Sequence, residues 1–202
     1  MIPVMGNVVS TLADRALAER HEAYAAEIRR LLDAALVVMR RDDTIDPRVS
    51  DIVRESGLSN QALYRHFKGK DELLLALLDD GRERLAATIE RRMARADSDA
   101  GRVRAWIEAV LAQARDAEAA AATRPFAING ERLTAQYPEE VGRSRERMLA
   151  PLRAITGEAS ATSVYHVAFG AMHDALAERR APQKSEVEQV VEFATRGCGI
   201  GT

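Results

Sequence analysis

Polar side chains between positions 59 and 70 have the residue types and the spacing that suit contact with DNA. Asn60 and Gln61 each carry a side-chain amide that can pair with an adenine edge in the major groove. Tyr64, His66 and Lys70 carry groups that suit phosphate oxygens. The segment therefore predicts a surface that reads bases with one part and holds the phosphate backbone with another.

Each of these residues also has a role that needs no DNA. Ser59 is suited to cap the helix that starts at Asn60. Tyr64 and His66 can pack against the next helix, and the two amides can be ordinary solvated side chains. Arg65 can contact DNA, solvent or a surface carboxylate.

The elements that would position these side chains are two short helices joined by a tight turn. The first is predicted to start at Asp46-Pro47, because aspartate can cap a helix and proline suits its first position. The second covers residues 60–67. Gly57 supplies the left-handed backbone that the turn between them needs. This pattern is typical of a helix-turn-helix, with Leu63 and Phe67 expected in its core.

Composition limits what the rest of the chain can be. Its 202 residues carry a net charge of −2, so a DNA-binding surface has to be local. Residues 48–70 provide one, with five basic and two acidic side chains. The single cysteine, Cys198, excludes an intramolecular disulfide and a cysteine zinc site. The sequence has no apolar run of membrane-spanning length and no convincing signal peptide, so we expect a cytoplasmic protein without a membrane partner.

Apolar residues recur at helical spacing along the chain, and no segment has the alternation of a strand, so the fold class is all-α. A first helix is expected from about Ala23 to Arg40, and a long one follows Lys68-Gly69. Beyond Asp97 we expect helices over 101–122, 139–155, 160–180 and 185–196. Pro125, Gly130 and Pro138 are expected to break residues 124–138 into loops and a short helix.

Three pieces of the helix-turn-helix region carry a resemblance: Gly57-Leu58-Ser59, Leu63-Tyr64-Arg65-His66-Phe67 and Lys70-Asp71-Glu72-Leu73. With the helix before it, the region over about residues 25–78 resembles the DNA-binding domain of TetR/AcrR-family transcriptional regulators. The resemblance implies that Tyr64, His66 and Lys70 contact phosphates and that Asn60 and Gln61 approach bases.

Two positions depart from the family pattern. Arg48 stands where the family often has a threonine that contacts phosphate. Met39 and Asp42-Asp43 stand where a glycine and an aromatic are usual, which bears on packing more than on function. The DNA-binding candidates are thus Arg48, Ser59, Asn60, Gln61, Tyr64, Arg65, His66 and Lys70.

The resemblance also implies an organisation of the whole chain. Residues 1–22 would be an N-terminal extension, 23–70 the three-helix DNA-binding domain, and 71–202 a helical bundle for effector binding and dimerisation. We expect a homodimer through the last two helices, whose small and branched apolar residues allow close approach. These are Ala168, Gly170, Ala171, Ala175, Val187, Val190, Val191 and Ala194.

An effector cavity would be lined by aromatic and sulfur-containing side chains with a few polar tips, which suit a largely apolar ligand. The candidates are Trp106, Phe126, Tyr137, Met148, Tyr165, His166, Phe169, Met172 and His173. Each can instead be ordinary core. His166 and His173 are seven residues apart and share a helix face, so they can meet a ligand or lie at the dimer seam.

The resulting prediction is a ligand-controlled repressor that binds a near-palindromic operator as a dimer and is released by a small molecule. An enzyme is the first alternative, but the sequence lacks paired Glu-x-x-His motifs and a phosphate-binding glycine loop. The second alternative is a helical adaptor whose helix-turn-helix no longer binds DNA. We expect no catalytic residues, no metal and no cofactor.

Overall fold

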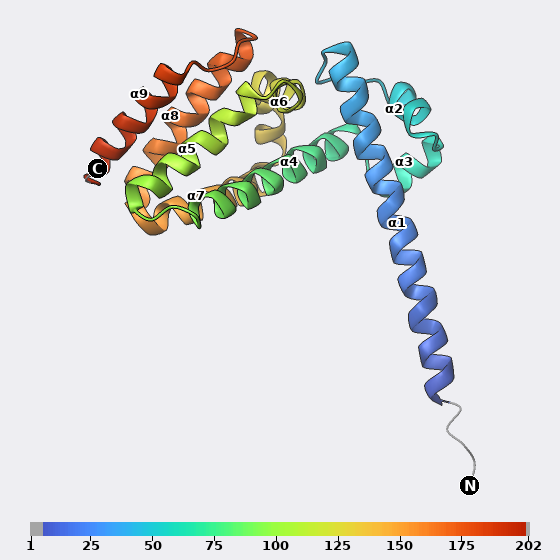
Figure 1. Cartoon of the computed structure of the whole chain (residues 1–202). Helices are drawn as coiled ribbons and strands as arrows, with labels where there is room; N and C mark the ends of the chain where they lie inside the picture. Colours follow the sequence, from blue (N-terminus) through green and yellow to red (C-terminus); the bar gives the residue numbers. More distant parts are fainter. Residues whose placement is uncertain (1–5, 201–202) are drawn as a thin grey trace.

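The computed structural model describes residues 6–200, and this part of the chain forms nine α-helices and no strand (Figure 1). The all-α prediction is confirmed. In chain order the helices are α1 (Gly6–Asp42), α2 (Val49–Ser56), α3 (Asn60–His66), α4 (Lys70–Met93), α5 (Asp99–Arg115), α6 (Ala117–Gln136), α7 (Pro138–Thr156), α8 (Glu158–Ala177) and α9 (Lys184–Gly197).

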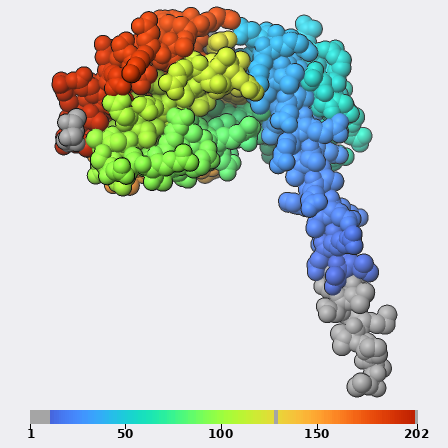
Figure 2. Space-filling model, viewed as in Figure 1, coloured from blue at the N-terminus to red at the C-terminus, as the bar shows by residue number. Residues whose placement is uncertain are grey.

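The first helix is longer than its apolar stripe predicts. It begins by Gly6 instead of about Ala23 and has 37 residues, which make it roughly 55 Å long. Residues 11–22 are exposed, and Figure 2 shows this part of α1 projecting from the rest of the molecule. The helix continues because the segment is rich in alanine, leucine, arginine and glutamate, which favour helix without any packed face. The start of the predicted extension, residues 1–5, lies outside the described residues.

One hydrophobic cluster, which we call the N-terminal cluster, unites α1, α2, α3 and the first half of α4. The predicted core positions Leu63 and Phe67 lie in it and are buried, which confirms that prediction. Leu133 of α6 also enters it. Its buried members are Leu31, Ala34, Ala35, Met39, Ile52, Leu63, Phe67, Leu73, Leu74, Leu77 and Leu133.

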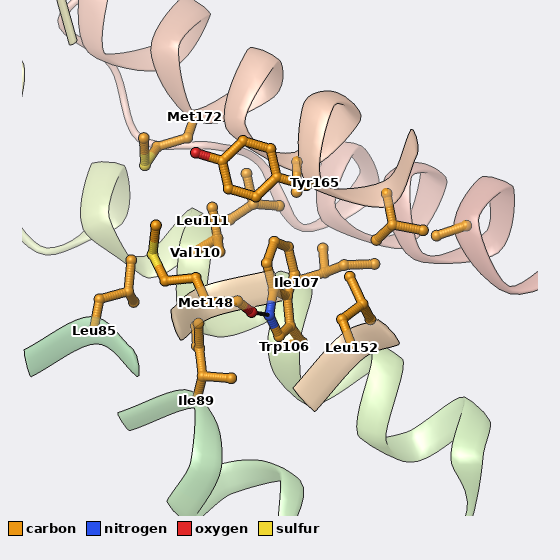
Figure 3. Close-up of a cluster of buried hydrophobic side chains, with 14 of the residues drawn as sticks. Leu85, Ile89, Trp106, Ile107, Val110, Leu111, Met148, Leu152, Tyr165 and Met172 are labelled. Atoms are coloured by element: carbon orange, nitrogen blue, oxygen red, sulfur yellow. Dashed lines mark hydrogen bonds between the residues drawn. The ribbon is translucent and has the colours of Figure 1, made fainter. Parts of the chain in front are cut away.

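A larger C-terminal cluster fills the body formed by α4 to α9. Trp106 is fully buried at its centre, and its indole Nε1 donates a hydrogen bond to the carbonyl of Met148 at 3.0 Å (Figure 3). Figure 1 shows α5 lying among α4, α8 and α9, with the end of α9 far from α1. The two clusters therefore lie side by side along α4, which contributes to both.

The prediction for residues 101–138 is wrong in two ways. The predicted helix over 101–122 ends at Arg115, where Asp116 adopts an extended backbone and its carboxylate accepts the amide of Ala119 at 2.8 Å. A new helix, α6, then continues through Pro125 and Gly130 to Gln136. Asp116 acts as an N-cap, whereas Pro125 removes one backbone donor without ending the helix.

The predicted start of α2 is also wrong. The helix begins at Val49, and Arg48 precedes it without a side-chain cap. Asp46 does not cap α2, because its carboxylate forms an ion pair with Lys70 at 2.5 Å instead. Within the described residues, no helix is both long and apolar enough to span a membrane.

Candidate DNA-binding surface and effector cavity

The turn between α2 and α3 has the geometry that its sequence predicts. Gly57 has φ 64° and ψ 21°, the left-handed conformation, and its amide points back to the carbonyl of Arg54 at 3.4 Å. Ser56 closes the turn, since its hydroxyl accepts the amide of Leu58 at 3.2 Å. From α1, the guanidinium of Arg30 donates to the carbonyl of Ser56 at 2.6 Å. The turn is thus anchored to α1 as well as closed locally.

The next helix, α3, presents three of the predicted side chains on one exposed face. Asn60, Gln61 and Tyr64 are all exposed, with 57% of Tyr64 accessible. Positions 60, 61 and 64 point in similar directions because a helix turns about 100° per residue. Ser59 caps this helix, and its hydroxyl accepts the amide of Ala62 at 3.1 Å. We call α3 the recognition helix and this face its outer face.

Two other predicted residues, Arg65 and His66, turn toward α1. The His66 side chain has no exposed surface, and its Nε2 lies 2.7 Å from a carboxylate oxygen of Glu27. Arg65 forms an ion pair with the same oxygen. The ring of Tyr24 packs edge-on against His66 at 4.3 Å between centroids. This placement disagrees with the expected His66 phosphate contact, because the imidazole is enclosed between α1 and α3.

Glu27 is a positioning residue that the sequence analysis did not single out. Hydrogen bonds from His66 and then Arg65 hold the pKa of its carboxyl below the usual range. The two partners lie 38 and 39 residues further along the chain. No local spacing signals such a contact, so it can be found only once α1 and α3 are known to pack together.

The remaining predicted residues lie at the edges of this surface. Arg48 is exposed just before α2. Lys70 begins α4, and its ion pair with Asp46 holds the pKa of that carboxyl below its ordinary value. Lys68 is exposed and lies just after the recognition helix, two residues before Lys70. A phosphate at Lys70 would have to compete with the Asp46 carboxylate.

The body contains a cavity of about 1010 Å³ between α1, α4, α6 and α8, with Gln113 of α5 and the linking residue Asp116 also in its lining. Six of the nine candidates named from the sequence line it. They are Phe126, Tyr165, His166, Phe169, Met172 and His173. The rings of Tyr165 and Phe169 stack at 4.2 Å, and burial raises the pKa of the Tyr165 hydroxyl.

Three predicted residues do not line this cavity. Trp106 and Met148 are fully buried in the C-terminal cluster, where the Trp106 indole donates a hydrogen bond to the Met148 carbonyl (Figure 3). Tyr137 joins α6 to α7 and packs against the N-terminal cluster. These three side chains pack in or against the hydrophobic clusters, as large apolar side chains of a helical bundle usually do.

The cavity also has polar lining that the sequence analysis missed. Arg82, Gln113, Thr123 and Thr134 contribute to its walls. Nothing in the spacing of these residues distinguishes them from the solvated faces of their helices. These polar residues can be recognised as cavity lining only when α6 is known to be one continuous helix beside α4.

One helix, α6, joins the cavity to the N-terminal cluster. Phe126 lines the cavity and also packs against that cluster, and Leu133 is buried in it. Arg124 of α6 pairs with Asp43 at 3.5 Å, at the end of α1. Arg132 pairs with Asp71 at 2.8 Å, at the start of α4. A shift of α6 would therefore change the packing of α1 and α4, the helices that support the recognition helix.

Comparison with known proteins identifies the family. The family described as "Bacterial regulatory proteins, tetR family" matches residues 31–77. The HTH-type transcriptional regulator TtgW of Pseudomonas putida, itself uncharacterized, is 32% identical over 134 residues, which cover 66% of this chain and 92% of TtgW. The chain belongs to the TetR family. It is thus a DNA-binding transcriptional regulator of a family whose members are generally not enzymes.

Other relatives agree with the TetR-family assignment. The HTH-type regulator SrpR of Pseudomonas putida is also 32% identical over 134 residues, although the match spans only 58% of SrpR. Among solved structures, FadR of Bacillus subtilis, determined with stearoyl-CoA, has TM-score 0.65 at 16% identity over 84% of this chain and 98% of its own. A TetR-family regulator from Marinobacter aquaeolei has TM-score 0.63 at 15% identity over 86% and 96%. At these identities the structures support the fold alone.

Proposed function

We propose that this protein is a ligand-responsive repressor that binds a near-palindromic operator as a homodimer and leaves it when a small molecule enters the cavity. The observation that carries the proposal is the position of α6. It lines the cavity through Phe126 and enters the N-terminal cluster through Leu133. The same helix would thus contact a ligand in the cavity and support the recognition helix through the N-terminal cluster.

The DNA-binding part of the proposal assigns residues 23–70 to the DNA-binding domain and gives the outer face of the recognition helix to the major groove. Asn60 and Gln61 would contact base edges, while Tyr64 would hold a phosphate. Arg48, Ser59 and Lys70 would contact the phosphate backbone on either side, with Lys70 exchanging Asp46 for a phosphate. Arg65 and His66 would instead keep the helix against α1 through Glu27.

The dimer part of the proposal uses the outer faces of α8 and α9. Five of the eight apolar residues expected at the interface are buried in the protomer's own core: Ala168, Ala175, Val187, Val191 and Ala194. The surface left for a partner includes Phe193, which is 63% exposed on α9. The proposal requires a two-fold axis there that places both recognition helices on one side of the dimer, at the spacing of successive major grooves, about 34–36 Å.

Release by the ligand follows from a difference in affinity between two arrangements of the dimer. A ligand shifts this equilibrium only if it binds the low-affinity arrangement more tightly. The ion pairs of Arg124 and Arg132 would carry a shift of α6 to the end of α1 and the start of α4. FadR of Bacillus subtilis, solved with stearoyl-CoA, is a structural relative with a bound small molecule, which supports a ligand role for this cavity.

The test is a selection of genomic DNA fragments with the purified protein at two salt concentrations. A near-palindromic site that survives the higher salt is the expected result, since contacts with bases persist when phosphate contacts are screened. Sequence-blind binding that vanishes with salt would contradict the proposal. Absence of binding by protein freed of ligand would favour a helical adaptor with a degenerate helix-turn-helix.

A further inference from the structure

The cavity wall holds a guanidinium, that of Arg82, with no carboxylate partner among the described residues. Arg82 of α4 lines the cavity, and within the described part of the chain no carboxylate forms an ion pair with it. Its Nη1 donates to the carbonyl of Val141 at 3.2 Å and lies 3.4 Å from the hydroxyl oxygen of Ser144. Burial lowers the pKa of this guanidinium, but an arginine stays protonated in proteins. A partly buried positive charge of this kind is stabilised when an anion binds beside it.

A second guanidinium strengthens the positive character of this end of the cavity. Arg145 of α7 lies over the ring of Tyr165, with 4.8 Å from its central carbon to the ring centroid. Its Nη2 lies 3.2 Å from Nε2 of His166, and because a guanidinium only donates, this imidazole nitrogen accepts. Tyr165 and His166 both line the cavity, whereas Arg145 stands behind them. The positive charge of Arg145 also repels that of Arg82 and lowers the pKa of the Arg82 guanidinium.

Most carboxylates near the cavity form ion pairs with other arginines or cap a helix. The carboxylate that acts on Arg82 most directly is Asp79, which itself forms an ion pair with Arg147. Of the carboxylates in the cavity wall, that of Glu118 pairs with Arg40 at 3.2 Å, and that of Asp80 pairs with Arg84. The acidic wall residues are Asp80, Asp116, Glu118 and Glu131.

The cavity lining also includes large apolar side chains. They come from α4, α6 and α8: Leu77, Leu78, Leu85, Phe126, Phe169 and Met172. A volume of about 1010 Å³ is ample for a molecule of drug size. The cavity thus combines apolar walls with the guanidinium of Arg82, which has no carboxylate partner in the part of the chain that the structure describes.

We propose that the effector is an organic anion with an apolar body, and that Arg82 binds its anionic group. The inference rests on the proposed effector role of the cavity and narrows the chemistry of the ligand. The planar fork of a guanidinium matches a carboxylate or a phosphate with two parallel hydrogen bonds. His173 also lines the cavity, where burial lowers its pKa, and its imidazole can hydrogen-bond a ligand.

The test uses two fluorescent probes that differ by one anionic group. They are 1-anilinonaphthalene-8-sulfonate and the neutral N-phenyl-1-naphthylamine, titrated into wild type, Arg82→Met, Arg82→Lys and the control Arg84→Met. Arg84 also lines the cavity but is paired with Asp80. We expect Arg82→Met to weaken the sulfonate about 10- to 100-fold, the range of a charged hydrogen bond, and the neutral probe less than about twofold.

Two further arms sharpen the expected result. Arg82→Lys keeps the charge and should retain part of the preference for the sulfonate, while Arg84→Met should resemble wild type. Decanoate and decyl phosphate should displace the sulfonate probe from wild type better than decanol does. The ratio of the first two then distinguishes a carboxylate from a phosphate ligand.

The outcomes separate this inference from the proposed function. Equal weakening of both probes by Arg82→Met would make Arg82 a structural clip between α4 and α7, and would overturn the inference. An unchanged preference for the sulfonate would overturn it too, yet leave the cavity as a ligand site. If wild type binds none of the probes and decanoate does not alter DNA binding, both the inference and the proposed effector function fail.

Discussion

Glu27 fixes the orientation of the recognition helix by holding two of its side chains. One carboxylate oxygen serves both His66 and Arg65, and rotation of the enclosed imidazole would break the hydrogen bond of its Nε2, since Nδ1 has no partner among the described residues. The outer face of α3 therefore stays directed away from α1. Pre-orientation of this kind favours DNA binding because less ordering remains to be done on contact.

The ion pairs of Glu27 lead to a prediction about pH. Because its folded-state pKa is lowered, Glu27 stabilises the native state above about pH 4.5, and this contribution is lost as pH falls through the lowered pKa. The difference in free energy of unfolding between wild type and Glu27→Gln should thus be largest near neutral pH and shrink below about pH 4. Urea unfolding across this range measures it. Glu22→Gln, an exposed change on the same helix, is the matched control for the loss of one carboxylate.

The outer face of the recognition helix leads to a second prediction. Tyr64→Ala should weaken binding to operator and random DNA alike, by about 1 kcal/mol or roughly fivefold, since a phosphate contact carries no sequence information. Gln61→Ala should change the preferred base at one position, by about 1–3 kcal/mol of discrimination. Competition binding with operators varied at single positions measures both. Equal losses on operator and random DNA for both variants would contradict the assignment.

His66 shows why the sequence could predict part of this surface but not all of it. The motif identifies the helix and its polar residues, yet Tyr64 and His66 are two residues apart and so point about 200° apart around it. Only one of them can share the outer face with Asn60 and Gln61. The sequence alone does not say which, because the partner of His66 lies 39 residues away.

The helix α6 is the element whose role was hardest to predict. Pro125 and Gly130 indicate breaks, but the helix carries on through both and so reaches both hydrophobic clusters. A proline costs one hydrogen bond in the helix interior, and tertiary packing on both sides can offset that cost. By contrast, α8 and α9 follow simple apolar periodicity, and their predicted bounds lie within three residues of those observed.

A change in α6 should therefore loosen the support of the recognition helix. Leu133→Ala removes a fully buried side chain of the N-terminal cluster and should cost about 2–5 kcal/mol. Amide hydrogen exchange should rise in α2 and α3, although the change lies in a helix far along the chain. Leu152→Ala, fully buried in the C-terminal cluster, is the matched control and should raise exchange in the body first. The same exchange pattern for both variants would refute this role of α6.

The turn between α2 and α3 gives a prediction about backbone conformation. Gly57→Ala places a methyl group at φ 64° and 3.3 Å from the Arg30 guanidinium, so it should lower the free energy of unfolding by about 1–2 kcal/mol. Gly142→Ala, at an exposed position in the second turn of α7 with open space around it, should act in the opposite direction by up to about 1 kcal/mol. Thermal or urea unfolding measures both. A neutral result at Gly57 would mean that the turn adopts another conformation in solution.

At the scale of the whole molecule, the cavity lies between the DNA-binding surface and the proposed dimer surface. It is formed where α1, α4, α6 and α8 converge, close to the N-terminal cluster, while the end of α9 lies at the far side of the body (Figure 1). The proposed dimer surface and the recognition helix are thus separated by the element that the ligand touches. This order suits control of the distance between two recognition helices better than direct obstruction of DNA.

The proposed dimer leads to the last prediction. Phe193→Asp places a charge on the exposed face of α9 and should convert a dimer into a monomer at micromolar concentration, as measured by sedimentation equilibrium. Leu17→Asp is the matched control, because Leu17 is also 63% exposed, on the projecting part of α1. Operator affinity should fall at least about tenfold for Phe193→Asp, since the second half-site no longer binds at high effective concentration, while probe binding in the cavity persists. A dimer that survives this change would place the interface elsewhere, and a monomeric wild type would remove the two-fold arrangement altogether.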